Sequence, residues 1–262
     1  MDSDDLPRLD PSQRDLLADD HDHAGVAGPP LDRLGCWGKS AAPASPPGYD
    51  LGVLASLWPL FGLTVQTSRL KLRLPREQEI AELAGRGVHH PGERPFLTPW
   101  TAGDPQDRAR FILQEYWSQL GTWSVRAWRL GLGAFLDEQP LGILTLRARD
   151  FPVVAEVTTS SWLGLPHHGK GYGTEARAGL LTLAFDHLGA DAALTEVFQD
   201  NHSSQRVSRK LGYEPDGISR DARGSEVVIS DRLRLTRQKW QSQSQTGATV
   251  VGFADCRSMF GQ

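Results

Sequence analysis

Three glycines at alternate positions are the strongest chemical signal in this sequence. Residues 168–174 read HGKGYGT and lie between a strand-like segment and a helix-like segment. The start of a helix exposes backbone N–H groups that have no partner within the helix, and the helix dipole adds partial positive charge there. Glycines let a phosphate approach such a backbone closely. The segment therefore predicts a pyrophosphate-binding loop, with a plain structural turn as the alternative.

Two familiar nucleotide-binding motifs do not fit this loop. A Walker loop needs G-x-x-x-x-G-K-[ST], which residues 169–171 do not supply. A Rossmann fingerprint needs G-x-G-x-x-G early in a βαβ unit, whereas the spacing here is G-x-G-x-G and follows several strand-like segments. Both motifs are disfavoured, and a nucleotide-binding module of another fold stays open as an alternative.

The loop must be positioned by a sheet, and hydrophobic periodicity predicts which segments form it. Segments with the alternation or the apolar character of strands are 69–74, 128–136, 141–146, 153–163, 194–198 and 226–235. Segments with the helix period follow Pro75, span about 105–120 and 203–211, and begin at the glycine loop. The strands before the loop indicate an antiparallel meander, and the strand, helix and strand around it indicate a parallel crossover. We predict a mixed α/β (α+β) fold with helices on both faces of the sheet.

The composition changes at both ends of this pattern. Residues 1–50 hold ten Asp against four Lys or Arg, with clusters of Pro and Gly, so they bury too little apolar surface to offset the entropy of ordering. The stretch after Gln241 turns rich in Gln and Ser and loses periodicity. We predict a disordered acidic tail over 1–50, a folded domain over 51–241 and a C-terminal tail over 242–262.

Charge and cysteine content exclude several classes of function. A net charge of -4 disfavours nucleic-acid binding, which needs a basic face. Cys36 and Cys256 are the two cysteines, too few for a zinc site with paired cysteines or a disulfide framework. The adjacent His167 and His168 have no third ligand at a suitable spacing, so no metal is expected. No apolar run is long enough for a membrane span, which predicts a cytoplasmic protein without a membrane partner.

Two blocks of the sequence resemble the GNAT superfamily of N-acetyltransferases. The glycine loop matches the pattern [Q/R]-x-x-G-x-[G/A], except that His168 stands at its first position. Residues 201–213, NHSSQRVSRKLGY, resemble the superfamily's N-x-x-[A/S] helix with its Leu-Gly-Tyr ending. The resemblance covers about 69–240 and is strongest to the ribosomal-protein, or RimJ/RimL, type. It implies a mostly antiparallel central sheet flanked by helices and acetyl-CoA as co-substrate.

The resemblance also implies roles for individual residues. The backbone around Trp162, Leu163, Gly164 and Leu165 would pair with the pantetheine arm of CoA. The pyrophosphate would be held by the loop, which comprises His168, Gly169, Lys170, Gly171, Tyr172, Gly173 and Thr174. Asn201 would bind the pantetheine. Many members place a Tyr seven residues after this Asn as the acid for the leaving thiolate, but Ser208 occupies that position, and Ser204 is the substitute that the RimL-like type suggests.

Transfer to an amine requires that the amine lose a proton, because its free pKa is about 8 for an α-amine and about 10.4 for a lysine. Glu156, on the strand that leads into the loop, is the expected general base, directly or through a water. A solvent-facing strand carboxylate is the alternative for Glu156, and a helix-end hydrogen bond is the alternative for Ser204.

These inferences predict an acetyl-CoA-dependent N-acetyltransferase that acts on a protein N-terminal α-amine or a small-molecule amine. A catalytically silent acyl-CoA-binding sensor is the alternative, and a homodimer is left open. Four tryptophans either line an acceptor pocket or pack in the core: Trp100, Trp117, Trp123 and Trp128. Residues His89, His90 and Glu93 fall where the fold usually forms its acceptor loop.

Overall fold

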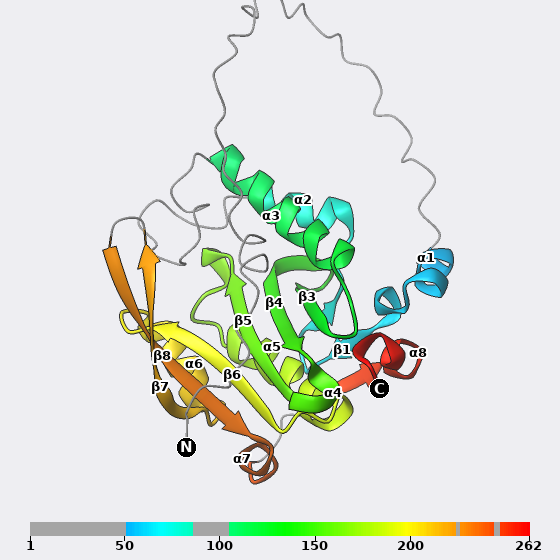
Figure 1. The fold of residues 1–262 in the computed structure, drawn as a ribbon. Coiled ribbons are helices and arrows are strands. Elements are labelled where there is room, and N and C mark those ends of the chain that lie inside the picture. Colours follow the sequence, from blue (N-terminus) through cyan, green and yellow to red (C-terminus); the bar gives the residue numbers. More distant parts are fainter. Residues whose placement is uncertain (1–50, 86–104, 224–225, 244–246) are drawn as a thin grey trace, which may run out of the picture. The chain divides into compact units, whose positions relative to one another are not determined.

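The computed structural model describes residues 51–85, 105–223, 226–243 and 247–262. The expected acidic tail over 1–50 and the acceptor-loop residues His89, His90, Glu93 and Trp100 lie outside the described residues. Within them, one sheet of nine strands has the order β7-β8-β6-β5-β4-β3-β2-β1-β9 (Figure 1). Every neighbouring pair is antiparallel except β5 and β6. The predicted mixed, mostly antiparallel fold is therefore confirmed.

The segments predicted as strands and helices occur in the predicted order, and β1, β7 and β9 are strands that were not predicted. The strands are β1 Thr64–Gln66, β2 Lys71–Arg73, β3 Ala127–Leu136, β4 Gln139–Arg149, β5 Glu156–Leu163, β6 Ala192–Phe198, β7 Glu214–Arg223, β8 Glu226–Thr236 and β9 Thr249–Val251. The α-helices are α1 Leu51–Leu57, α2 Glu77–Gly85, α3 Pro105–Gly121, α4 Phe151–Val154, α5 Tyr172–Thr182, α6 His202–Lys210, α7 Arg237–Gln241 and α8 Phe253–Cys256. Short 3₁₀ turns are η2 Pro59–Gly62, η4 Leu165–His167 and η6 Arg257–Phe260, and α5 continues into a π-helical turn, η5 Leu183–His187.

The two faces of the sheet bury different cores. Adjacent residues on β4 show this, because side chains alternate between the faces of a strand. Leu144 belongs to the large core that includes Leu180 of α5, whereas Ile143 belongs to a smaller core with Ile80 of α2 and Tyr116 of α3. Helix α5 therefore covers one face and helices α2 and α3 cover the other, as predicted.

The third predicted strand begins later than its sequence suggests. Phe151–Val154 forms the short helix α4, although its two valines favour a strand. Asp150 and Ala155 flank this turn with positive φ angles of 48° and 52°, and Pro152 fits the first turn of a helix. β5 therefore starts only at Glu156.

The C-terminal segment differs from the expected tail beyond residue 241. Strand β9 pairs with β1 and forms one edge of the sheet. Phe253, Cys256 and Phe260 follow at helix-like spacing and are buried in the large core. The segment was too short and too irregular for a periodicity argument, but the apolar area that it buries fixes it to the domain.

Candidate active site

Strands β5 and β6 separate part-way along their length. They pair in register over Glu156–Thr158 and Ala192–Leu194, at the start of both strands. At the point of separation, side-chain hydroxyls replace the backbone hydrogen bonds between the strands. Thr159 Oγ1 donates to Leu194 O over 3.2 Å, and Thr195 Oγ1 donates to Thr159 O over 2.9 Å. Beyond these residues the two strands diverge (Figure 1). A wedge thus opens in the middle of the sheet.

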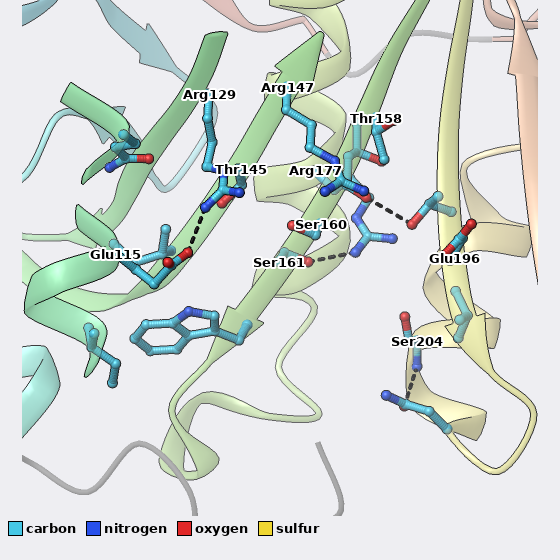
Figure 2. Close-up of a pocket in the computed structure, with 18 of the residues that line it drawn as sticks. Glu115, Arg129, Thr145, Arg147, Thr158, Ser160, Ser161, Arg177, Glu196 and Ser204 are labelled. Atoms are coloured by element: carbon cyan, nitrogen blue, oxygen red, sulfur yellow. Dashed lines mark hydrogen bonds and ion pairs between the residues drawn. The ribbon is translucent and has the colours of Figure 1, made fainter. Parts of the chain in front are cut away.

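A cavity of about 430 Å³ lies at this wedge. Its lining comes from α2, α3, β3, β4, β5, α5, β6, α6 and β8. Apolar walls include Ile80, Ile143, Trp162, Val197 and Phe198. Ten polar or charged residues that line it are labelled in Figure 2: Glu115, Arg129, Thr145, Arg147, Thr158, Ser160, Ser161, Arg177, Glu196 and Ser204. An apolar cavity of roughly 300–1,000 Å³ with a few convergent polar groups is typical of small-molecule sites.

The glycine loop connects β5 to α5 beside this cavity. Gly169 and Gly171 have φ angles of +73° and +82°, in the left-handed region where glycine avoids a steric cost. Gly171 is the N-cap residue of α5, and no side chain of the described residues caps the helix. His168 Nε2 donates to Leu163 O over 2.8 Å and so ties the loop to the end of β5. The first turn of α5 therefore keeps backbone N–H groups for an anion.

Glu175, in the first turn of α5, anchors this loop to the turn between β1 and β2. Its Oε1 accepts hydrogen bonds from Thr67 Oγ1 at 2.7 Å, Ser68 Oγ at 3.0 Å and Arg69 N at 2.8 Å. Its Oε2 accepts from Arg69 Nε at 2.6 Å. Burial acts to raise the pKa of Glu175, but the hydrogen bonds from Thr67, Arg69 and Ser68 outweigh it and lower that pKa below its ordinary value. The carboxylate is thus fully engaged by the protein.

Arg69 completes the anchor on the loop side. Its guanidinium lies 4.6 Å from the centroid of the Tyr172 ring, and Nη1 donates to Lys170 O over 3.3 Å. Sequence reasoning missed this network. The sequence did hold a signal for Glu175, because an acidic side chain in the first turn of a helix interacts favourably with the helix dipole.

Arg177 is a buried cation on the cavity wall, with only 3% of its surface exposed. Nη2 donates to Ser161 Oγ over 2.6 Å and Nη1 donates to Ser208 Oγ over 3.3 Å, while Nε has no hydrogen-bond partner among the described residues. Within the described part of the chain no carboxylate pairs with it. Burial therefore lowers its pKa, and Tyr213 offsets this only partly. Sequence reasoning missed Arg177, although a charged residue on the apolar face of α5 was a signal.

Helix α6 supplies the two residues predicted from the second sequence block. Asn201 is the N-cap of α6, and its Oδ1 accepts from Ser204 N over 3.0 Å. Ser204 lines the cavity, and its hydroxyl makes no hydrogen bond within the described residues. The helix-end bond is therefore made by the backbone of Ser204 and the side chain of Asn201, which leaves the Ser204 hydroxyl available.

The two acidic candidates on β5 and β6 lie in different places. Glu156, the base expected from the sequence, pairs with Arg234 at the start of β5, with Oε1 at 2.6 Å from Nη1. It does not line the cavity. Glu196 lies on β6 beyond the point of separation, lines the cavity and makes no ion pair or hydrogen bond within the described residues (Figure 2). The geometry thus favours Glu196 over Glu156 as a group that can meet a ligand.

The remaining predicted site residues divide between the cavity and the loop. Trp162, Asn201 and Ser204 line the cavity. The residues that form the end of β5, the loop and the start of α5 are Leu163, Gly164, Leu165, His168, Gly169, Lys170, Gly171, Tyr172, Gly173 and Thr174. The predicted cofactor residues thus come from two places, the stretch 162–174 and the start of α6.

Several other sequence expectations can be compared with the described residues. Trp123 and Trp128 stack at 5.8 Å between ring centroids and pack in or against the large core, so packing explains them better than an acceptor pocket does. Trp117 is half exposed, at 50%. The described residues contain no group of three or more His, Cys, Asp or Glu suited to a metal ion. Nor does any helix among them have the length and apolar character needed to cross a membrane.

The family profile described as an acetyltransferase (GNAT) domain matches residues 69–214, more than half of the 262-residue chain. The chain belongs to the GNAT acetyltransferase family. This match includes both sequence blocks as well as β5, β6 and the wedge between them.

Solved structures of low sequence identity share the GNAT fold. A Vibrio cholerae protein described as a ribosomal-protein-serine acetyltransferase is 19% identical, with a TM-score of 0.52 over 66% of this chain and 97% of the other. RimJ of Mycobacterium smegmatis, solved with CoA-disulfide, is 16% identical, with a TM-score of 0.55 over 70% and 90%. A spermidine N-acetyltransferase chimera of Vibrio cholerae SpeG and hSSAT is 12% identical, with a TM-score of 0.55 over 67% and 100%.

Proposed function

We propose that this protein transfers the acetyl group of acetyl-CoA to an amine. The observation that carries the proposal is the wedge between β5 and β6, which opens beside the glycine loop and contains a cavity of about 430 Å³. Membership of the GNAT family supports an acetyltransferase. A small-molecule amine or a protein N-terminal α-amine of the RimJ/RimL type remains the expected acceptor, in the cytoplasm.

The residues present fit a CoA ester. The uncapped start of α5, with its positive-φ glycines, suits a pyrophosphate. The diverging edge of β5 at residues 160–163 suits the amides of pantetheine, because an extended ligand can take the place of a neighbouring strand. The unpartnered Nε of buried Arg177 suits a polar or anionic ligand atom.

Acetyl-CoA supplies an activated thioester. The amine nitrogen attacks the carbonyl carbon, a C–N bond forms, the C–S bond breaks, and the electron pair leaves with sulfur. Glu196 accepts the proton that the amine must lose, directly or through a water. Ser204 donates a hydrogen bond toward the departing sulfur, and the fixed positive charge of Arg177 stabilises the negative charge that develops there.

Arg177 replaces, in this scheme, part of what a tyrosine does in many relatives. Ser208 stands at the tyrosine position and accepts a hydrogen bond from Arg177 Nη1. An arginine cannot act as an acid at neutral pH, so it contributes charge instead of a proton. Ser204, whose hydroxyl is available, contributes the hydrogen bond.

The experiment measures free thiol released from acetyl-CoA with a panel of amines, for the wild type and two matched variants. Glu196→Gln and Glu156→Gln remove the same charge from neighbouring strands, inside and outside the cavity. We expect Glu196→Gln to lower kcat about 100-fold and Glu156→Gln to change it by less than about threefold, which is the usual range for a surface charge. The reverse ranking would overturn our choice of base. CoA binding without thiol release from any amine would favour the sensor instead.

A further inference from the structure

Arg129 and Arg147 form an unusual pair on the wall of the cavity. They are Cα partners across β3 and β4, and both line the cavity. Figure 2 shows their side chains at the same end of it. Like charges directly opposite on neighbouring strands are destabilising. A pair of this kind therefore calls for a negatively charged group.

The protein supplies this negative charge only in part. Glu115 of α3 pairs with Arg129, with Oε2 at 2.6 Å from Nη1. Arg147 makes no ion pair or hydrogen bond within the described residues, and its other cross-strand neighbour is Thr158, a neutral residue. The guanidinium group of Arg147 thus has no carboxylate partner in the part of the chain that the structure describes.

The opposite wall of the cavity carries the opposite charge. Glu196 lies on β6, on the far side of the wedge, and strand β5 separates it from β4 in the sheet order. It is the remaining acidic residue among the described residues that line the cavity. The described lining therefore has a negative side at β6 and a positive side at β3 and β4. A ligand with a positive amine and a negative group would complement both sides.

We infer that the acceptor is an amine that also carries a carboxylate, with the amine at Glu196 and the carboxylate at Arg147 and Arg129. This inference rests on the proposed acetyl transfer and specifies its substrate class. Guanidinium groups bind carboxylates with two parallel hydrogen bonds, and they repel a polyamine or an aminoglycoside. A free dicarboxylic amino acid and a peptide with an acidic N-terminal residue share this chemistry.

The test compares matched acceptors by kcat/KM with the full chain and saturating acetyl-CoA. The peptides begin with Glu, Gln or Lys and are otherwise identical, and free glutamate and spermidine complete the panel. We expect kcat/KM for the Glu peptide to be at least about tenfold higher than for the Gln peptide, because a charge-assisted hydrogen bond contributes at least that much. Faster acetylation of free glutamate than of the Glu peptide would identify a small-molecule acceptor, and the reverse would identify a protein N-terminus.

Two variants on the same strand isolate the role of Arg147. Arg147→Gln should abolish the preference for Glu over Gln, because kcat/KM should fall at least about tenfold more for the Glu peptide than for the Gln peptide. Arg149→Gln is the control, because Arg149 lies two residues further along β4, is exposed and does not line the cavity. It should leave the preference intact. Arg147→Glu should shift the preference toward the Lys peptide.

Calorimetric titration of unreacted acceptors gives a second readout without acetyl transfer. Arg147→Gln should weaken binding of the Glu peptide at least about tenfold more than it weakens binding of the Gln peptide. A preference of the wild type for spermidine or the Lys peptide would overturn the inference. An equal loss of affinity for all acceptors in Arg147→Gln would also overturn it. Absence of transfer to any amine would sink the proposed function, and the titration would still decide the inference.

Discussion

Glu175 and Arg177 lie two residues apart on α5, are both charged and are both withdrawn from water, yet their surroundings differ. The side chain of Glu175 is 12% exposed and accepts hydrogen bonds from three consecutive residues of the β1–β2 turn. Arg177 is 3% exposed, meets two serine hydroxyls, and has no carboxylate partner within the described residues.

The difference separates structural groups from groups that await a ligand. A buried charge is costly unless it is paired, so a fully paired one stabilises the local geometry. A buried charge without an ionic partner destabilises the free protein, because its desolvation is not compensated. When that charge lies on the wall of a cavity, a ligand can compensate it. The region around Glu175 therefore shapes the loop, and the region around Arg177 acts on what the loop binds.

The substitution Arg177→Met should have the largest effect, and it tests whether Arg177 acts on a ligand and not on stability. If Arg177 stabilises charge on the leaving sulfur, kcat should fall about 100-fold or more, as when one donor of an oxyanion site is removed. Replacement of a buried charge by an apolar residue is often neutral or stabilising, so the melting temperature should hold or rise. Steady-state kinetics and thermal unfolding of the same sample measure both. Equal loss of stability and turnover would mean that Arg177 is structural.

Glu175→Gln should show the opposite pattern, with an intermediate effect. Loss of a charged acceptor for several hydrogen bonds should cost about 1–3 kcal/mol of unfolding free energy. The affinity for CoA should fall because the loop loses its anchor, while kcat at saturating acetyl-CoA changes by less than about threefold. Denaturant unfolding and CoA titration measure the two effects. An unchanged stability would contradict the anchoring role.

The pH dependence of stability sharpens the same comparison. The pKa of Glu175 is lowered in the folded protein, so its contribution is fully present above the ordinary value of 4.5 and is lost as pH falls through the folded pKa. The wild type should therefore lose stability more steeply than Glu175→Gln below about pH 4.5. Unfolding titrations from pH 6 to pH 3 compare the two slopes, and parallel curves would contradict the assignment.

Glu115→Gln should have the smallest effect. Glu115 and Arg129 are both substantially exposed, at 48% and 41%, and such pairs contribute about 0–1 kcal/mol to stability. The substitution should leave the melting temperature nearly unchanged. It should also free Arg129 and improve KM for a carboxylate-bearing acceptor a few-fold. A worse KM for that acceptor would show that Glu115 helps to hold the amine.

Local patterns were enough to predict the glycine loop and the order of strands around it. Gly169 and Gly171 mark positive φ angles, and alternation or apolar character marks β3 to β6. Strand β9 could not be predicted this way, because three residues are too few for a period and its pairing with β1 spans most of the domain. The burial of Phe260 could not be predicted for the same reason, because it depends on contacts with residues far away in the sequence.

The candidate site was predicted less completely than the fold. Strand alternation places Glu156 on the same face of the sheet as Thr158 and Ser160, which line the cavity, so Glu156 lies on the cavity's face of the sheet. The sequence could not tell that β5 is still paired with β6 at Glu156 and separated from it only beyond Thr158. Glu196 and Arg177 enter the site through that separation, which is a tertiary feature.

The arrangement of tryptophans provides two optical reporters in one chain. Trp123 and Trp128 lie nearly parallel, at 17°, and each makes an edge contact with Phe260. Two indoles this close couple their electronic transitions, so their circular dichroism should report on whether the C-terminal segment is packed. Trp162 lies on the cavity wall, and its emission should respond to ligands. Folding and occupancy can therefore be followed at the same time by two spectroscopic signals from the natural side chains.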